Sequence, residues 1–121
     1  MAASRQWFDA QPHRRRLFSA GNNGKLVVMD STNGKVIVTV DIAKGVDQIA
    51  FDAGNKRLYC AAAGGVISVV QETAAGATLL ANVKTEATGH TLTVDPKTHA
   101  VWTAYGDKAG IASYIMKLSV P

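Results

Sequence analysis

The feature of this sequence that most constrains its fold is an internal repeat with a period of 43 residues. Three short apolar segments each end in an aspartate, and the aspartates Asp9, Asp52 and Asp95 follow one another at intervals of 43 positions. A second landmark, which combines aromatic and small residues, follows each aspartate at positions 17–20, 58–61 and 101–104. Such a repeat indicates a chain built from one supersecondary unit that is used several times.

The runs within each repeat are typical of β-strands. They are short, rich in Val, Ile, Thr and aromatic residues, and separated by turn formers such as the 30–35 segment with Gly34. The first two repeats carry four such runs each, whereas the third carries three before the sequence stops at Pro121. Four strands in about 42 residues indicate a β-propeller blade. A β-sandwich is the alternative all-β fold, but a sandwich does not require the repetition.

The residues of the repeat resemble those of the YVTN-type β-propellers, which are similar to lactonase-like propellers. The resemblance rests on Phe51-Asp52 followed by Leu58-Tyr59-Cys60-Ala61, and on the Asp-x-x-x-Gly-Lys-Val turn at 30–36. It implies an all-β propeller fragment of about three four-stranded blades. The expected blades cover residues 5–44, 45–87 and 88–121, with the last outer strand missing.

A propeller fragment of this size is expected to associate with itself. Propeller blades pack both faces against neighbouring blades, and runs such as those around Val27, Ile49 and Val69 are apolar enough to do so. Three blades alone would leave two apolar faces and a sheet edge in water, and closed symmetric association buries such surfaces. We therefore expect residues 1–121 to form a single three-blade unit that closes a six-bladed ring as a homodimer.

Chemistry is expected where the chain leads into the first strand of each blade. Asp47 and His90 lie 43 positions apart at equivalent places in two repeats. In a two-fold ring each would occur twice around one channel, and imidazole nitrogens and carboxylate oxygens bind Zn²⁺ or another divalent metal. A metal with an open position activates water. The sequence therefore predicts His90 and Asp47 as metal ligands and catalytic residues in the hydrolysis of an ester, lactone or phosphotriester.

A structural role for both residues is the alternative. A histidine at a strand start commonly hydrogen-bonds within its turn, and an aspartate such as Asp47 commonly caps one. The chain would then be a non-catalytic binding or assembly scaffold for a small ligand or a protein partner. By the resemblance, the loops of the same rim form the usual ligand face. They supply the candidate ligand-binding residues Asn22, Asn23, Glu86, Tyr105, Asp107 and Lys108.

The remaining conspicuous residues are interpreted as structural. His99 and the basic run from His13 to Arg16 are expected to be solvated turn residues on the opposite rim. Cys60 is expected to be a small buried apolar residue. The recurring aromatic residues are expected to form the core between blades; they are Trp7, Phe18, Tyr59 and Trp102.

Several function classes are disfavoured by what the sequence lacks. It has no Gly-x-Ser-x-Gly elbow, no phosphate-binding Gly-x-x-x-x-Gly-Lys motif and no His-Glu-x-x-His motif, so no nucleotide cofactor is expected. The net charge of +4 is too mild to predict nucleic-acid binding. No run is apolar over the roughly 18 residues that a membrane-spanning helix needs, and no secretory signal precedes the repeats. We therefore expect a cytoplasmic location for the chain as expressed, without membrane contact.

Overall fold

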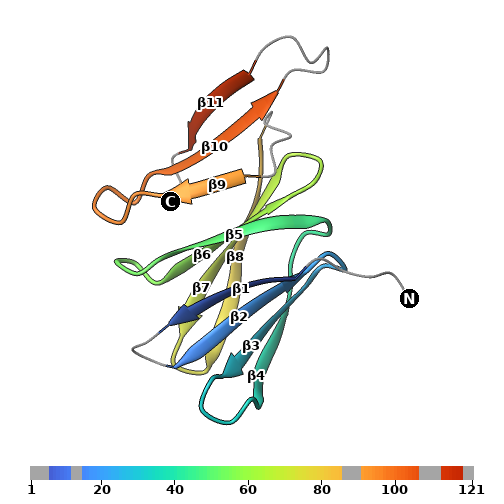
Figure 1. The fold of residues 1–121 in the computed structure, drawn as a ribbon, viewed down its shortest axis with the longest axis vertical. Helices are drawn as coiled ribbons and strands as arrows, with labels where there is room; N and C mark the ends of the chain where they lie inside the picture. The colour runs from blue at the N-terminus through green and yellow to red at the C-terminus, as the bar shows by residue number, and fades with distance from the viewer. Residues whose placement is uncertain (1–5, 12–14, 86–90, 107–112, 119–121) are drawn as a thin grey trace.

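The computed structural model describes residues 6–11, 15–85, 91–106 and 113–118, and these residues form an all-β fold (Figure 1). Three antiparallel sheets succeed one another along the chain, as the repeat predicts. The first sheet contains four strands in sequence order, which are β1 (Gln6–Gln11), β2 (Arg16–Gly21), β3 (Lys25–Asp30) and β4 (Val36–Asp41).

The second sheet repeats this order, and the third has three strands among the described residues. The strands of the second sheet are β5 (Val46–Asp52), β6 (Arg57–Ala62), β7 (Val66–Thr73) and β8 (Gly76–Lys84). Those of the third sheet are β9 (Thr91–Val94), β10 (Val101–Gly106) and β11 (Ser113–Leu118). Since β11 pairs only with β10, it is an edge strand within the described part of the chain.

The three sheets pack face to face along the long axis of the molecule, with the second sheet in the middle (Figure 1). Their first strands lie next to one another, because β5 contacts β1 on one side and β9 on the other. Sheets that succeed one another with their first strands together have the arrangement of propeller blades. The all-β, three-sheet fold predicted from the repeat is confirmed.

Alternation along β6 explains why the middle sheet can pack on both faces. Successive side chains of a strand point to opposite faces. Leu58 and Cys60 are buried against the first sheet, whereas Tyr59 and Ala61 are buried against the third. Both faces of the middle sheet are therefore core surfaces, as the apolar runs predict.

Two apolar clusters hold the sheets together. The cluster between the first and second sheets includes Phe18, Leu26 and Val28, and the ring of Phe18 stacks on that of Phe51 with centroids 5.6 Å apart. The cluster between the second and third sheets includes Tyr59 and Val101. Each large apolar side chain that is fully buried contributes about 1.5–3 kcal/mol, so these clusters supply the main force that holds the sheets together.

Polar contacts also cross between the sheets. The backbone N–H of Ala43 donates to Oγ of Ser68 over 2.9 Å, which ties the connection after β4 to β7. The backbone N–H of Leu92 in β9 donates to Oε1 of Gln48 in β5 over 2.8 Å. Because buried backbone donors are costly when unpaired, these bonds help to fix the position of one sheet on the next.

Candidate functional site

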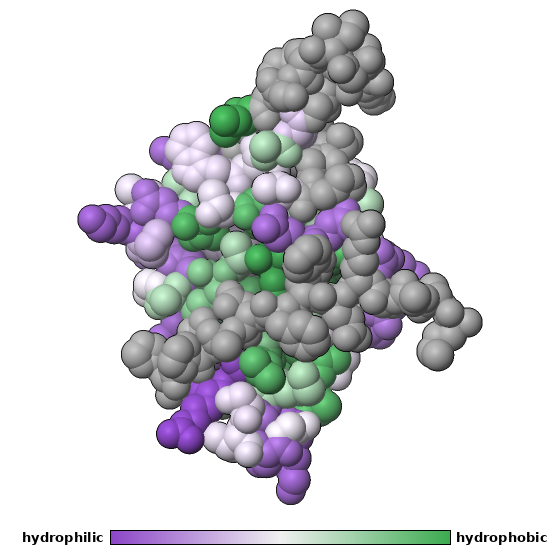
Figure 2. Space-filling view, viewed as in Figure 1, coloured by the Kyte–Doolittle hydropathy of each residue, from purple (hydrophilic) through white to green (hydrophobic). Residues whose placement is uncertain are grey.

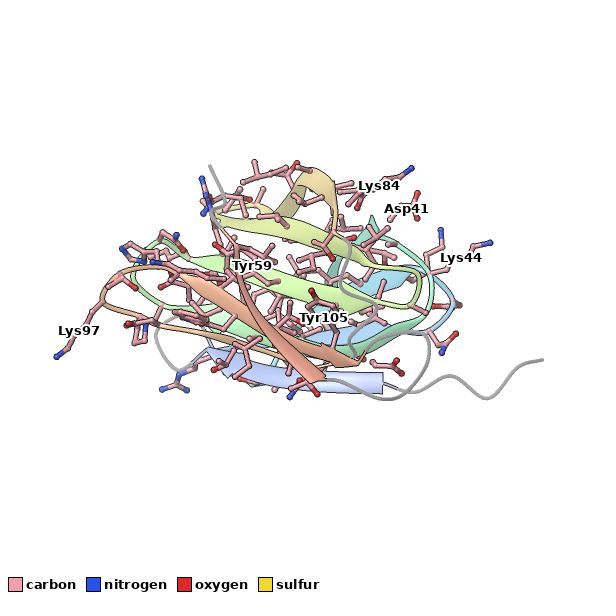
Figure 3. All side chains as sticks on the ribbon, turned by 90° about the horizontal axis from the view of Figure 1, so that it is seen from above. Asp41, Lys44, Tyr59, Lys84, Lys97 and Tyr105 are labelled. Carbon is pink, nitrogen blue, oxygen red and sulfur yellow. The ribbon has the colours of Figure 1, made fainter. Side chains whose placement is uncertain are left out.

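The predicted ligand rim is the end of the sheets where the β2–β3, β4–β5 and β6–β7 connections lie. Asp41 and Lys44 mark this end in Figure 3, with Lys84 on the same side and Lys97 on the opposite side of the molecule. Four of the eight predicted site residues belong to the described part of the chain. His90, Glu86, Asp107 and Lys108 lie outside the described residues, so their predicted roles stay predictions.

The pair Asn22 and Asn23 forms the β2–β3 turn at this rim, and both residues are exposed. The carbonyl oxygen of Asn22 accepts a hydrogen bond from the backbone N–H of Gly45 over 2.8 Å, which fastens the turn to the β4–β5 connection. The side-chain oxygen of Asn23 accepts from the backbone N–H of Lys25 over 3.2 Å. Each asparagine thus has a structural contact, and their predicted contact with a ligand remains untested.

Asp47 lies at the start of β5 and is half-buried. The pairing of β5 with β6 shifts register between Val46 and Gln48, so Asp47 occupies a β-bulge. Bulges commonly redirect a side chain, and they are frequent near functional sites. Asp47 therefore lies at the predicted rim. Its neighbour Gln48 accepts the hydrogen bond from the backbone N–H of Leu92 that joins β5 to β9.

Tyr105 lies at the end of β10 on the third sheet, where it pairs with Tyr114 of β11. It is half-buried and occupies the same rim as Asp47 by topology. Among the described residues, no group of three or more histidine, cysteine, aspartate or glutamate side chains could hold a metal ion. The predicted metal site of Asp47 and His90 therefore has no support from this part of the chain, and it stays a prediction.

The opposite rim contains an aspartate–histidine contact that the sequence analysis missed. Asp52, at the end of β5, is fully buried, and its Oδ2 lies 2.5 Å from Nδ1 of His99. The other carboxylate oxygen accepts from the backbone N–H of Gly54 over 2.9 Å. His99 therefore contacts a neighbouring sheet, which the sequence did not predict, although its side chain is 44% exposed in the turn, as the sequence predicts.

Backbone conformation explains how His99 reaches Asp52. His99 has a φ of 62°, and its N–H donates to the carbonyl oxygen of Asp95 over 2.7 Å. A positive φ is uncommon for a residue with a side chain, although histidine tolerates it better than most. The recurrence of Asp52 in the repeat together with a histidine in the next repeat's hairpin was the available signal, but sequence spacing does not reveal a left-handed backbone.

Arg16 also differs from its predicted role. It begins β2, is buried, and donates to the carbonyl oxygens of Thr73 at 2.6 Å and Ala74 at 2.9 Å in the β7–β8 turn. It also forms an ion pair with Glu72 at 3.3 Å. A guanidinium group offers five donors in a fixed plane, so one arginine can satisfy several carbonyl groups of a turn. The basic run is thus not wholly solvated, because Arg16 joins the first sheet to the second.

Cys60 is confirmed as a buried structural residue. It lies in the core between the first two sheets, and burial raises the pKa of its thiol to about 12. A thiol with so high a pKa is almost entirely protonated near neutral pH and is a poor nucleophile.

The third sheet exposes an apolar surface where core was predicted. Trp102 is 38% exposed and Ile115 is 76% exposed, and the ammonium group of Lys117 lies 5.7 Å from the centroid of the indole ring. A shallow hollow of about 200 Å³ is lined by residues that include Trp102, Ala104 and Ile115. The prediction of Trp102 as core was wrong, because no sheet formed by the described residues covers this face. Figure 2 shows hydrophobic residues at the surface in this upper part of the molecule.

Comparison with known proteins supports the fold. No family model matches this sequence. No curated protein matches it either. Among solved structures, a chain of hydrazine synthase from Kuenenia stuttgartiensis superposes with a TM-score of 0.74 at 16% identity over 90% of this chain. The β-propeller domain of Cps50 (Swd1) from Myceliophteria thermophila gives 0.70 at 15% identity over 100% of this chain.

A chain of the mitotic checkpoint complex is a third similar structure, with a TM-score of 0.69 at 14% identity over 81% of this chain. The present chain covers only 31% of the matched hydrazine synthase chain, 32% of that in the checkpoint complex and 41% of Cps50. At these identities the similarity defines the fold alone. The chain therefore has the fold of a β-propeller segment, and its resemblance to the YVTN-type family remains a prediction.

The structure also bears on the membrane prediction. The described ranges contain no helix that is long and apolar enough to cross a membrane.

Proposed function

We propose that this chain is a non-catalytic assembly scaffold, a propeller segment that associates with further blades through its open sheet face. The observation that carries this proposal is the exposure of Trp102 and Ile115 on the third sheet. Large contiguous apolar surfaces on proteins commonly mark interaction sites. Self-association into a homodimer of six sheets is the form of assembly that we propose, since it lies within the usual four to eight blades.

Such a scaffold would bind a small ligand or a protein partner through the polar groups of the predicted rim. Asn22, Asn23, Asp47 and Tyr105 lie at one end of the sheets, and propeller loops vary without disturbing the strands. We include ligand binding at this rim in the proposal on the basis of that placement. Metal-dependent hydrolysis at Asp47 and His90 stays an untested alternative.

An activity screen with and without chelator separates the scaffold from the hydrolase. The purified chain would be offered a lactone, a carboxylic ester and a phosphotriester, with added Zn²⁺ in one arm and a chelator in another. The scaffold predicts no turnover above background in either arm, and the same result for Asp47→Asn. Turnover that the chelator abolishes and that falls in Asp47→Asn and His90→Ala would overturn the non-catalytic proposal.

A further inference from the structure

The exposed aromatic residue of the third sheet occupies a position that is buried in the other two sheets. The repeat aligns three aromatic residues, which are Phe18, Tyr59 and Trp102. Each of them directly follows an aligned apolar residue, which is Leu17, Leu58 or Val101. Phe18 faces the second sheet and Tyr59 faces the third, and both are almost fully buried, at 0% and 1% exposed. Trp102 is therefore the residue that would face a next sheet.

The neighbours of Trp102 follow the same register. Thr93 pairs with Trp102, while Ala104 pairs with Thr91 on one side and Ile115 on the other, so these side chains share one face of the sheet. We call Thr93, Trp102, Ala104 and Ile115 the leading face. Its equivalents on β6 and β7 of the second sheet include Ala61, which is buried.

The first sheet carries the complementary surface. Leu17 pairs with Met29 and Ser19 pairs with Val27, so they share the face of the first sheet that points away from the second. We call Leu17, Val27 and Met29 the trailing face. The equivalents of Leu17, which are Leu58 and Val101, are buried against the preceding sheet, whereas Leu17 is only partly buried.

The leading and trailing faces together indicate which molecule covers each of them. We propose that the trailing face of a second copy of this chain packs on the leading face, so that the contact continues the sheet-to-sheet packing already present within the chain. This inference rests on the proposed self-association and adds which surfaces meet. Each copy has one face of each kind, so two copies placed head to tail make two equal contacts and leave neither face open.

The polar groups on the leading face are compatible with this packing. Lys117 lies over the Trp102 ring, and its strand β11 has a neighbour on one side only within the described residues. A lysine at a sheet edge can cover apolar surface with its stem while its ammonium group stays in water. Thr93 is a β-branched residue, and such residues fit the half-buried face of a sheet. Lys117 pairs with Trp102 as the buried Val69 pairs with Tyr59, so the contact requires the ammonium group of Lys117 to reach water along β11.

The test uses charge substitutions on the two faces of the full chain. Ile115→Glu alters the leading face, and Val27→Glu and Met29→Glu each alter the trailing face. Leu80→Glu is the matched control, since Leu80 is 47% exposed on β8 of the middle sheet. We expect each face variant to weaken association at least about tenfold, because an unpaired carboxylate would be buried, and Leu80→Glu to associate as the wild type does.

Mixing the variants tests the head-to-tail arrangement. Ile115→Glu retains an intact trailing face and Val27→Glu an intact leading face, so their equimolar mixture should recover dimers held by one intact contact. Circular dichroism and thermal unfolding verify that each variant is folded, and Met29→Glu replaces Val27→Glu if the latter is not.

The outcomes separate this inference from the proposed function. A wild-type chain that stays monomeric removes the proposed self-association itself. A dimeric wild type with dimeric Val27→Glu and Met29→Glu but monomeric Ile115→Glu means that two leading faces meet, which overturns the head-to-tail pairing. Dimers in all variants, or a mixture that stays monomeric, overturn it as well.

Discussion

Nδ1 of His99 lies 2.5 Å from Oδ2 of Asp52, and this contact joins the third sheet to the second. Asp52 is fully buried, so its carboxylate depends on the histidine and on the Gly54 N–H for hydrogen bonds. A buried polar group that loses a partner carries the full cost of its desolvation. The pair is therefore a structural connection between two blades.

His99→Ala is expected to lower the free energy of unfolding by about 1–3 kcal/mol, because it leaves an oxygen of Asp52 without a donor. Chemical denaturation of the two proteins measures the difference. Lys97→Ala serves as the control, since this exposed side chain belongs to the same turn and should change stability little. A double-mutant cycle with Asp52→Asn separates the contact from any effect on the backbone, and additive losses would contradict the coupling.

Arg16→Lys is expected to destabilise the protein by about 1–3 kcal/mol. Lysine cannot reproduce the planar donors that reach the carbonyl groups of Thr73 and Ala74 from one side chain. Arg15→Lys is the matched control, since Arg15 precedes it in the chain and is exposed. Equal unfolding midpoints for the two variants would mean that the bonds of Arg16 to the β7–β8 turn contribute nothing.

Gly76→Ala is expected to destabilise the protein more than Gly34→Ala does. Both glycines have positive φ, at 141° and 72°, so each alanine introduces backbone strain of about 1 kcal/mol. A Cβ at Gly76 would also lie 2.6 Å from Cγ1 of Val38, whereas one at Gly34 meets nothing within 4 Å. Thermal unfolding compares the two, and a Gly34→Ala loss as large as that of Gly76→Ala would contradict the steric argument.

The Asp95 turn is expected to lose stability in acid. The backbone N–H of Lys97 donates to Asp95 and, as the main cause, holds the pKa of this carboxyl below its usual value. A lowered pKa means that the folded state binds the proton less tightly than the unfolded chain does. Its contribution is therefore present above the unfolded pKa, near 3.9, and is lost as the pH falls through the lower folded value.

Denaturation curves at several pH values between neutrality and acid test this effect. Asp95→Ala should lose less stability than the wild type over the acid range, because it lacks the group that titrates there. Identical pH profiles would show that the hydrogen bonds to Asp95 do not stabilise the turn.

The fold could be predicted from the sequence because the first two repeats carry the same four runs of residues and the third carries three of them. The apolar runs around Ile49 and Val69 also indicated that both faces of the middle sheet would be buried. The exposure of Trp102 could not be predicted in this way. Trp102 itself obeys the repeat, and it differs from Phe18 and Tyr59 only in that no further sheet of the described residues packs on it. Repetition thus predicted each sheet more reliably than the burial of its outer face.

The contacts between sheets were predicted less well than the sheets. His99 and Arg16 were both predicted to be solvated. Arg16 is buried instead, and His99, although exposed, contacts Asp52 of a neighbouring sheet. These contacts depend on a left-handed backbone at His99 and on the placement of the β7–β8 turn beside β2. The local sequence predicts neither the left-handed backbone nor the placement of this turn. The topology brings the described residues of the predicted rim to one end of the sheets; they are Asn22, Asn23, Asp47 and Tyr105.

The mass of the wild-type chain in solution tests the central claim most directly. The proposed scaffold associates through its open sheet faces, so sedimentation equilibrium should give twice the chain mass of 12.7 kDa at micromolar concentration. Dilution should then return the monomer. A mass of 12.7 kDa throughout the micromolar range would show that the exposed Trp102 face does not bind a second copy and would contradict the account.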